Sequence, residues 1–165
     1  MSLKTPIYVH QYSVKECKKL EKFVLKNCKK WKKNLNYVKC VTSGFNPDYP
    51  PIDELESYAK KNILNFIKPH AIFYKTSFWF NFYKKNQVAE KHDHIPEKIS
   101  SVLIIKSSEE ECLQFHGSNN YLHKIKDKTG LWIFFPSFLP HSTLPVFKDR
   151  ITLALDFKEK EPWDL

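Results

Sequence analysis

The feature that most constrains this fold is the change of pattern that follows Pro69. From there the chain consists of short runs rich in β-branched and aromatic residues, separated by turn-forming segments such as Gly117-Ser118-Asn119-Asn120. The runs predict strands at residues 71–83, 87–94, 99–106, 111–116, 121–125, 131–135, 141–146 and 150–157. Many short strands in succession favour a sandwich or a barrel.

Two helices are predicted before this region. Ser13 and Glu16 form a capping-box pattern, and apolar residues then recur at helical spacing, which predicts a helix over residues 13–34. A second helix is predicted to begin at Asp53 and to end before Pro69. We therefore expect a mainly β fold braced by two helices. Residues 1–165 are expected to form one domain, with helical support over 1–69 and a β core over 70–157.

The charge of the chain bears on its partners. The net charge is +9, and the lysines are densest between Lys15 and Lys33, on the first predicted helix. We interpret them as a solvated helix face, so nucleic acid is an alternative partner that the sequence does not favour. No apolar stretch approaches the roughly 18 residues of a membrane span, so we expect no membrane partner. The four cysteines form no C-x-x-C pair and are expected to be free thiols of a cytoplasmic protein.

Three histidines are candidate metal ligands. His92 and His94 lie two positions apart on a predicted strand, so both side chains are expected on the same face. His141 follows an aromatic run and is flanked by Pro140 and Pro145, which restrict the backbone. Two convergent histidines and a third from a distant strand suit a facial metal site.

Arg150 is the only arginine in a chain that otherwise relies on lysine. Its planar fork can hold a carboxylate through two parallel hydrogen bonds, and Thr152, on the same strand face, can add a hydroxyl. A turn at residues 147–149 would join the strand after His141 to the strand that begins at Arg150. We therefore predict a hairpin that brings metal and guanidinium into one pocket, where a small dicarboxylate could be held at both ends.

The segment Gly130-Leu131-Trp132-Ile133-Phe134-Phe135-Pro136-Ser137, followed by His141 and then Arg150-Ile151-Thr152, resembles the Fe(II)- and 2-oxoglutarate-dependent oxygenases. The pattern is most similar to that of small bacterial and phage members, which are prolyl-hydroxylase-like. The resemblance is strongest over residues 77–157. It implies a double-stranded β-helix (jelly roll), iron(II), 2-oxoglutarate and dioxygen as cofactor and cosubstrates, and a cytoplasmic protein, of a bacterial host if phage-encoded.

The resemblance also implies roles for individual residues. His92 and His141 match metal ligands, Arg150 and Thr152 match the residues that bind the far carboxylate of 2-oxoglutarate, and Tyr83 is similar to a tyrosine that reaches the cosubstrate. The usual third ligand is an aspartate, and His94 stands in its place. Three ligands therefore stay open: His94 itself, Asp93 through a bulge, or Glu97 from the following turn. Strand parity favours His94.

The expected activity is hydroxylation of an unidentified prime substrate, such as a peptidyl prolyl or other protein residue or a small molecule, with release of succinate and carbon dioxide. One alternative is a non-catalytic, cupin-like metal-binding module that acts as a small-molecule or nucleic-acid adaptor. Another is a basic nucleic-acid-binding scaffold with an incidental histidine cluster, which predicts salt-dependent binding indifferent to iron.

Overall fold

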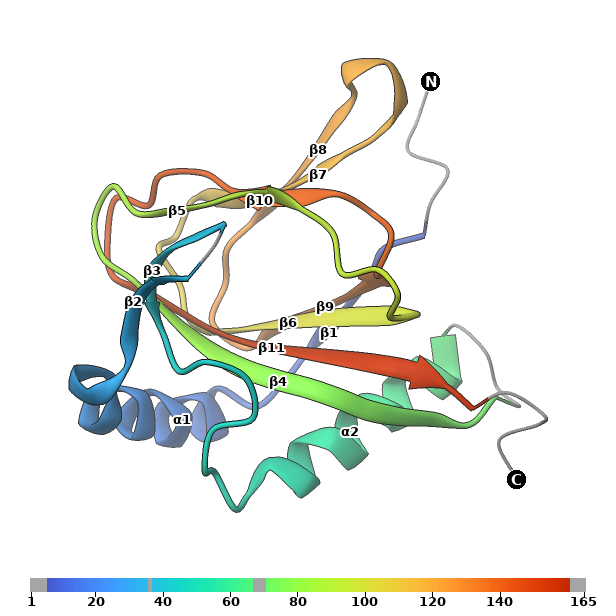
Figure 1. Ribbon diagram of the computed structural model, residues 1–165, viewed down its shortest axis with the longest axis horizontal. Coiled ribbons are helices and arrows are strands. Elements are labelled where there is room, and N and C mark those ends of the chain that lie inside the picture. Colours follow the sequence, from blue (N-terminus) through green and yellow to red (C-terminus); the bar gives the residue numbers. More distant parts are fainter. Residues whose placement is uncertain (1–5, 36, 67–70, 161–165) are drawn as a thin grey trace.

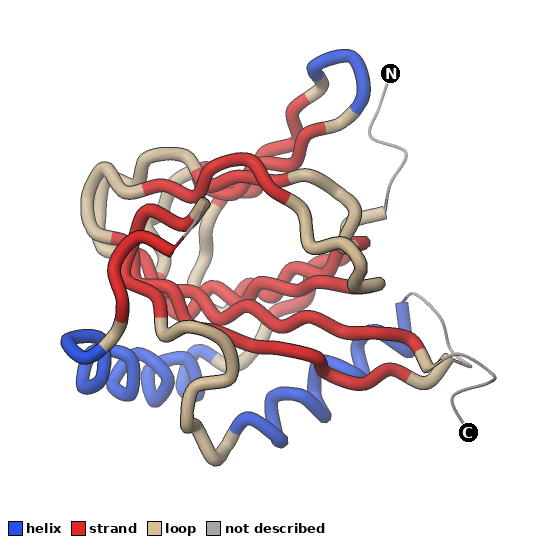
Figure 2. Tube along the Cα trace, viewed as in Figure 1, coloured by secondary structure: helices blue, strands red, loops and turns tan. Residues whose placement is uncertain are grey.

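The computed structural model describes residues 6–35, 37–66 and 71–160. Its strands form one curled antiparallel sheet with the order β1-β9-β6-β11-β4-β3-β5-β10-β7-β8, and β2 pairs with β3 outside this path. The sheet folds over at β3, so that its two halves lie above one another, and the two helices lie beneath the lower half (Figures 1 and 2). Two opposed half-sheets enclose the interior that holds the candidate site.

The lower half contains the long strands. These are β1 (Tyr8–Gln11), β4 (Phe73–Tyr83), β6 (Ile99–Lys106), β9 (Leu131–Pro136) and β11 (Arg150–Glu159). The upper half contains β5 (Val88–His92), β7 (Glu111–His116), β8 (Leu122–Lys126) and β10 (His141–Thr143), and β2 (Lys32–Leu35) and β3 (Val38–Thr42) lie at the fold. The β7–β8 hairpin, which carries a 3₁₀ turn at Ser118–Asn120, projects beyond the body of the molecule (Figure 1).

The helices α1 (Val14–Asn27) and α2 (Ile52–Phe66) cover the outer face of the lower half-sheet. Their apolar faces, including Leu20 and Ile63, pack with alternate residues of β11 such as Leu153 into one buried core. Burial of this kind is the main favourable term in folding. Because side chains alternate along β11, the residues between these core positions point into the space between the half-sheets.

The predicted start of the first helix is confirmed, and its predicted end at residue 34 is wrong. Ser13 Oγ accepts a hydrogen bond of 3.3 Å from the Glu16 amide, while the Glu16 carboxylate pairs with Lys19 at 2.9 Å. The helix ends at Asn27, a 3₁₀ turn follows at Cys28–Lys30, and β2 begins at Lys32. Pairing of β2 with β3 satisfies the backbone there, so tertiary pairing overrides the helical periodicity. The strands β1, β2 and β3 were not predicted.

All eight strands predicted after Pro69 are present, and no predicted end differs from the observed one by more than three residues. The predicted hairpin between the His141 strand and the Arg150 strand is wrong. β10 pairs with β5 and β7, whereas β11 pairs with β4 and β6. β11 is drawn into the lower half because its apolar face packs against the helix-covered core, and the turn therefore crosses from one half-sheet to the other.

Candidate metal centre

Three histidine side chains meet between the half-sheets. His92 is the last residue of β5, His94 follows two positions later, and His141 opens β10, where it pairs directly with His92. One ligand atom from each ring lies within 4.8 Å of those of the other two. Among the described residues, this is the only group of three or more potential ligands so arranged.

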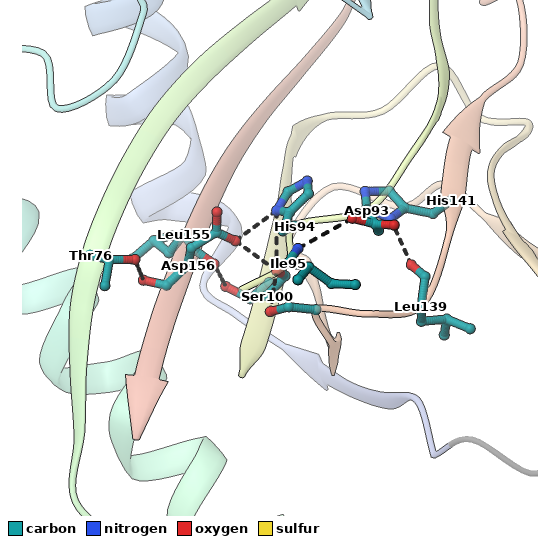
Figure 3. A network of polar contacts seen from close by, with 11 residues as sticks. Thr76, Asp93, His94, Ile95, Ser100, Leu139, His141, Leu155 and Asp156 are labelled. Atoms are coloured by element: carbon teal, nitrogen blue, oxygen red, sulfur yellow. Dashed lines mark hydrogen bonds and ion pairs between the residues drawn. The ribbon is translucent and has the colours of Figure 1, made fainter. Parts of the chain in front are cut away.

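Each ring is oriented by an acceptor at Nδ1. His92 Nδ1 lies 2.7 Å from the Glu90 carbonyl, and His141 Nδ1 lies 3.1 Å from the Leu139 carbonyl (Figure 3 shows the second contact). A carbonyl can only accept, so Nδ1 of both rings must carry the proton, and Nε2 keeps its lone pair. Hydrogen bonds at Nδ1 that leave Nε2 available are the usual outer-shell arrangement of metal-bound histidine.

His94 supports the same reading more strongly. Its Nδ1 lies 2.7 Å from Asp156 Oδ1, and its Nε2 is buried without any hydrogen-bond partner. A buried imidazole nitrogen without a partner costs free energy unless something else binds it. Nitrogen donors that converge from three imidazoles suit iron, zinc, copper and nickel, so the residues present fit a transition metal.

Burial also sets the charge of the site. The pKa of His92 falls to about 4, chiefly through burial. The hydrogen bond to Glu90 opposes this shift, and the neighbouring His94 adds to it. The pKa of His141 lies well below its usual range. Burial is the main cause, and the nearby His92 and His94 lower it further. Both rings are therefore neutral at physiological pH, which is the protonation state that binds a metal.

The alternatives for the third ligand lie outside the cluster. Asp93 is exposed, and its Oδ1 accepts a 3.3 Å hydrogen bond from the Ile95 amide in the turn after β5 (Figure 3). Glu97 is half-buried and belongs to no cluster of potential ligands in the described chain. The geometry thus brings His94 beside His92, as strand parity predicts, although β5 itself ends at His92. A ligand role for His94 stays a prediction.

The predicted cosubstrate residues line the same pocket as the histidines. Tyr83, Arg150 and Thr152 face it from β4 and β11, where Arg150 pairs with Tyr83 in register. Arg150 is almost fully buried, and its guanidinium lies 5.4 Å from the Tyr83 ring centroid. The structure therefore places the guanidinium and the three imidazoles on one cavity from opposite half-sheets. That these residues bind 2-oxoglutarate stays a prediction.

No protein-family model matches the sequence, and no curated protein matches it. Solved structures do match. A prolyl-4-hydroxylase from Pseudomonas putida superposes with a TM-score of 0.76 and 13% identity, covering 96% of this chain and 95% of that one. A viral collagen prolyl hydroxylase from Paramecium bursaria Chlorella virus-1, solved with 2-oxoglutarate, gives a TM-score of 0.68 and 19% identity over 92% and 94%. A Trichoplax adhaerens prolyl hydroxylase bound to a hypoxia-inducible-factor peptide gives 0.77 and 13% over 94% and 84%.

The chain has the jelly-roll fold of the 2-oxoglutarate oxygenases. The fold does not choose the reaction, because a 2-oxoglutarate-dependent carbocyclase of nogalamycin biosynthesis also matches, with a TM-score of 0.75 and 8% identity over 93% and 79%. These similarities show the fold, and the three-histidine cluster adds a possible metal site inside it. In the described part of the chain no helix is long and apolar enough to cross a membrane.

Two buried carboxylates of this jelly roll were missed by sequence reasoning. Asp156 contacts His94, and Asp127 pairs with Arg150 through bonds of 2.6 and 3.1 Å. Asp156 has the same strand parity as Arg150 and Thr152, so an acidic residue at an inward position was its available signal. Asp127 lies between the strands predicted at 121–125 and 131–135, and nothing local in the sequence links it to Arg150.

Proposed function

We propose that this protein is an Fe(II)- and 2-oxoglutarate-dependent dioxygenase that hydroxylates a C–H bond of a prime substrate. In the balanced reaction, 2-oxoglutarate, dioxygen and the substrate R–H give succinate, carbon dioxide and R–OH. The observation that carries the proposal is a single pocket lined by three metal-competent imidazoles and by the only arginine of the chain. The jelly-roll fold is consistent with it.

His92, His94 and His141 would hold the iron. When bound, iron(II) supplies the redox chemistry that allows dioxygen to react with an organic molecule, and the protein supplies orientation and a dry cavity. Both imidazoles with lowered pKa values, His92 and His141, enter the reaction as neutral donors and do not have to lose a proton first. No catalytic residue beyond the metal site is proposed.

Arg150 would bind the far carboxylate of 2-oxoglutarate. A guanidinium has five N–H groups. Two of those on Arg150 donate to Asp127, so three are left for a ligand. Thr152 can donate a hydroxyl beside them, and the buried phenol of Tyr83 can donate because burial raises its pKa and keeps it protonated. The anion would thus be bound by one cation and neutral donors.

The prime substrate would approach the imidazoles past aromatic side chains. Tyr37 stacks on His92 with ring centroids 3.8 Å apart, and Trp79 lies against His94 at 5.4 Å. Both line the pocket. Such walls suit an apolar group that presents an unactivated C–H bond, and a peptidyl prolyl or other protein residue is the substrate class that we propose, with a small molecule as the alternative.

One observation favours a second candidate, a metal-binding module without oxygen chemistry. The pocket is small, with a free volume of about 30 Å³. A metal ion fits that space as it stands, whereas 2-oxoglutarate fits only if lining side chains move. Under this second candidate, the protein binds iron but does not consume the 2-oxo acid.

The test is the formation of succinate. Protein, Fe(II), 2-oxoglutarate and air are incubated with ascorbate, and succinate is quantified by mass spectrometry, with and without short proline-containing peptides. The proposed oxygenase forms succinate in proportion to enzyme and loses it in His141→Ala. His123→Ala is the control, because His123 lies on the projecting hairpin and outside the pocket. Stoichiometric iron binding with no succinate would establish the second candidate instead.

A further inference from the structure

A buried carboxylate stands directly behind one of the three histidines. Asp156, on β11, is 5% exposed, and its Oδ1 lies 2.7 Å from His94 Nδ1 (Figure 3). The same oxygen accepts a 2.6 Å hydrogen bond from Ser100 Oγ. The arrangement links β11 of the lower half-sheet to His94, two residues after the end of β5 of the upper half-sheet, so it is a long-range, specifically built contact.

A serine pair holds this carboxylate in place. The single hydroxyl proton of Ser100 goes to Asp156, so Ser100 accepts from Ser137 Oγ at 2.8 Å. The backbone carbonyl of Ser137 also accepts a 2.9 Å hydrogen bond from the backbone amide of His94. The backbone and the ring of His94 are therefore both fixed. Two oxygens lie near His94 Nδ1, and Asp156 Oδ1 at 2.7 Å is a nearer acceptor for its proton than Ser100 Oγ at 3.1 Å.

The direction of that proton matters for the opposite nitrogen. With Nδ1–H donated to a carboxylate, Nε2 of His94 carries a lone pair, and it is the buried nitrogen without a partner. A carboxylate behind an imidazole raises its basicity as a metal ligand, because negative charge stabilises the charge that the ring donates. His92 and His141 have only neutral carbonyls at the corresponding place.

We propose that Asp156 supplies, through His94, the negative charge that a three-histidine site otherwise lacks. The carboxylate acts as a positioning residue one hydrogen bond away from the metal, and the His94–Asp156 pair functions as one anionic ligand. This inference rests on the proposed metal site. It explains how a histidine, His94, can serve where the usual third ligand is an aspartate. The merely structural alternative is that Asp156 only ties β11 to the turn after β5.

The experiment measures metal affinity rather than turnover. Anaerobic Fe(II) and Co(II) titrations are made on wild type and on Asp156→Asn, which keeps Oδ1 as an acceptor for Ser100 and His94, removes the charge and replaces Oδ2 by an NH2 group. We expect the variant to bind both metals at least about 10-fold more weakly. Asp149→Asn is the charge-matched control, since Asp149 pairs with Lys84 and lies outside the pocket, and it should keep the wild-type metal affinity.

A second variant separates charge from structure. In the double variant His94→Asp/Asp156→Asn the carboxylate moves onto the metal itself, and metal affinity should return towards the wild-type value. A structural role predicts no such rescue, because Asp156 is still absent. If Asp156→Asn alone does not fold, the double variant decides: metal binding supports the proposal and its loss overturns it.

The outcomes distinguish this inference from the proposed function. Wild-type protein that binds no metal contradicts the metal site as a whole. Wild-type protein that binds metal, with Asp156→Asn binding equally tightly, overturns only the role of Asp156. Equal losses of affinity in Asp156→Asn and Asp149→Asn would also overturn it, because the effect would then be that of removing any negative charge.

Discussion

Arg150 and Asp127 form a two-point ion pair inside the pocket wall, with Nε 2.6 Å from Oδ2 and Nη2 3.1 Å from Oδ1. Their side chains are 1% and 0% exposed. Burial alone would lower the pKa of Arg150, but Asp127 more than offsets it, and the net shift is upward. The guanidinium of Arg150 is therefore held rigid and charged. Its Nε and Nη2 atoms bond Asp127, and this contact fixes the orientation of its remaining N–H groups.

The first prediction concerns the cosubstrate. Arg150→Ala should weaken 2-oxoglutarate binding by an order of magnitude or more, because truncating one partner of a buried charge pair typically costs about 2–5 kcal/mol. Arg150→Lys should fall between, since lysine keeps the charge without the planar fork. Anaerobic calorimetric titration of the metal-loaded proteins measures this. Metal affinity should hardly change in either variant. Equal 2-oxoglutarate affinity in all three proteins would show that Arg150 does not bind the cosubstrate.

The second prediction concerns Asp127. Asp127→Asn leaves the buried guanidinium without its counter-ion, which should lower the free energy of unfolding by about 3–5 kcal/mol. A dicarboxylate bound at Arg150 would replace the missing charge, so 2-oxoglutarate should raise the melting temperature of the metal-loaded variant more than that of wild type. Urea unfolding and thermal scans measure both effects. A smaller ligand-induced shift in the variant would mean that Asp127 is required to position the fork.

The third prediction concerns the ligand set. His92→Ala and His141→Ala should abolish stoichiometric binding of Fe(II), Mn(II) or Ni(II), and His94→Ala should cost far more affinity than Asp93→Ala or Glu97→Ala. The reason is that, in the described part of the chain, the three histidines are the one group that brings such ligand atoms together. Metal content after anaerobic gel filtration reports the result. Greater damage from Asp93→Ala or Glu97→Ala would place the third ligand elsewhere.

The fourth prediction concerns pH and the metal-free protein. The folded-state pKa of His92, about 4, lies below its unfolded value of 6.5, so the unfolded chain takes up the proton first as pH falls. Its contribution to stability is complete above pH 6.5 and is lost between 6.5 and about 4. The urea midpoint should therefore drop between pH 7 and pH 5, and it should drop less in His92→Gln. Parallel drops in both proteins would contradict the burial of a neutral ring.

The sequence predicted most of the β region because its signals are local. Strand runs after Pro69 are bounded by turn residues, and the parity of His92 and His94 was enough to place both rings on one side. Sheet membership could not be predicted this way. β10 and β11 are neighbours in sequence but lie in opposite half-sheets, because the apolar face of β11 is drawn to the helix-covered core.

The two buried carboxylates illustrate the same limit. Asp127 and Asp156 lie 23 and 62 residues from their partners Arg150 and His94, so only the three-dimensional pairing reveals them. The region before Pro69 fails for a different reason. Trp31 continues the helical apolar period, yet the backbone that follows it gains more by pairing with β3 than by extending α1.

The central claim is tested most directly by the fate of dioxygen. Oxidative decarboxylation of 2-oxoglutarate makes a new carboxylate, and in the proposed reaction one oxygen atom of that group comes from dioxygen. Metal-loaded protein turning over 2-oxoglutarate under ¹⁸O₂ should therefore give succinate that carries one ¹⁸O atom, and His141→Ala should give none. Unlabelled succinate, or no succinate from protein shown to hold iron, would contradict the account.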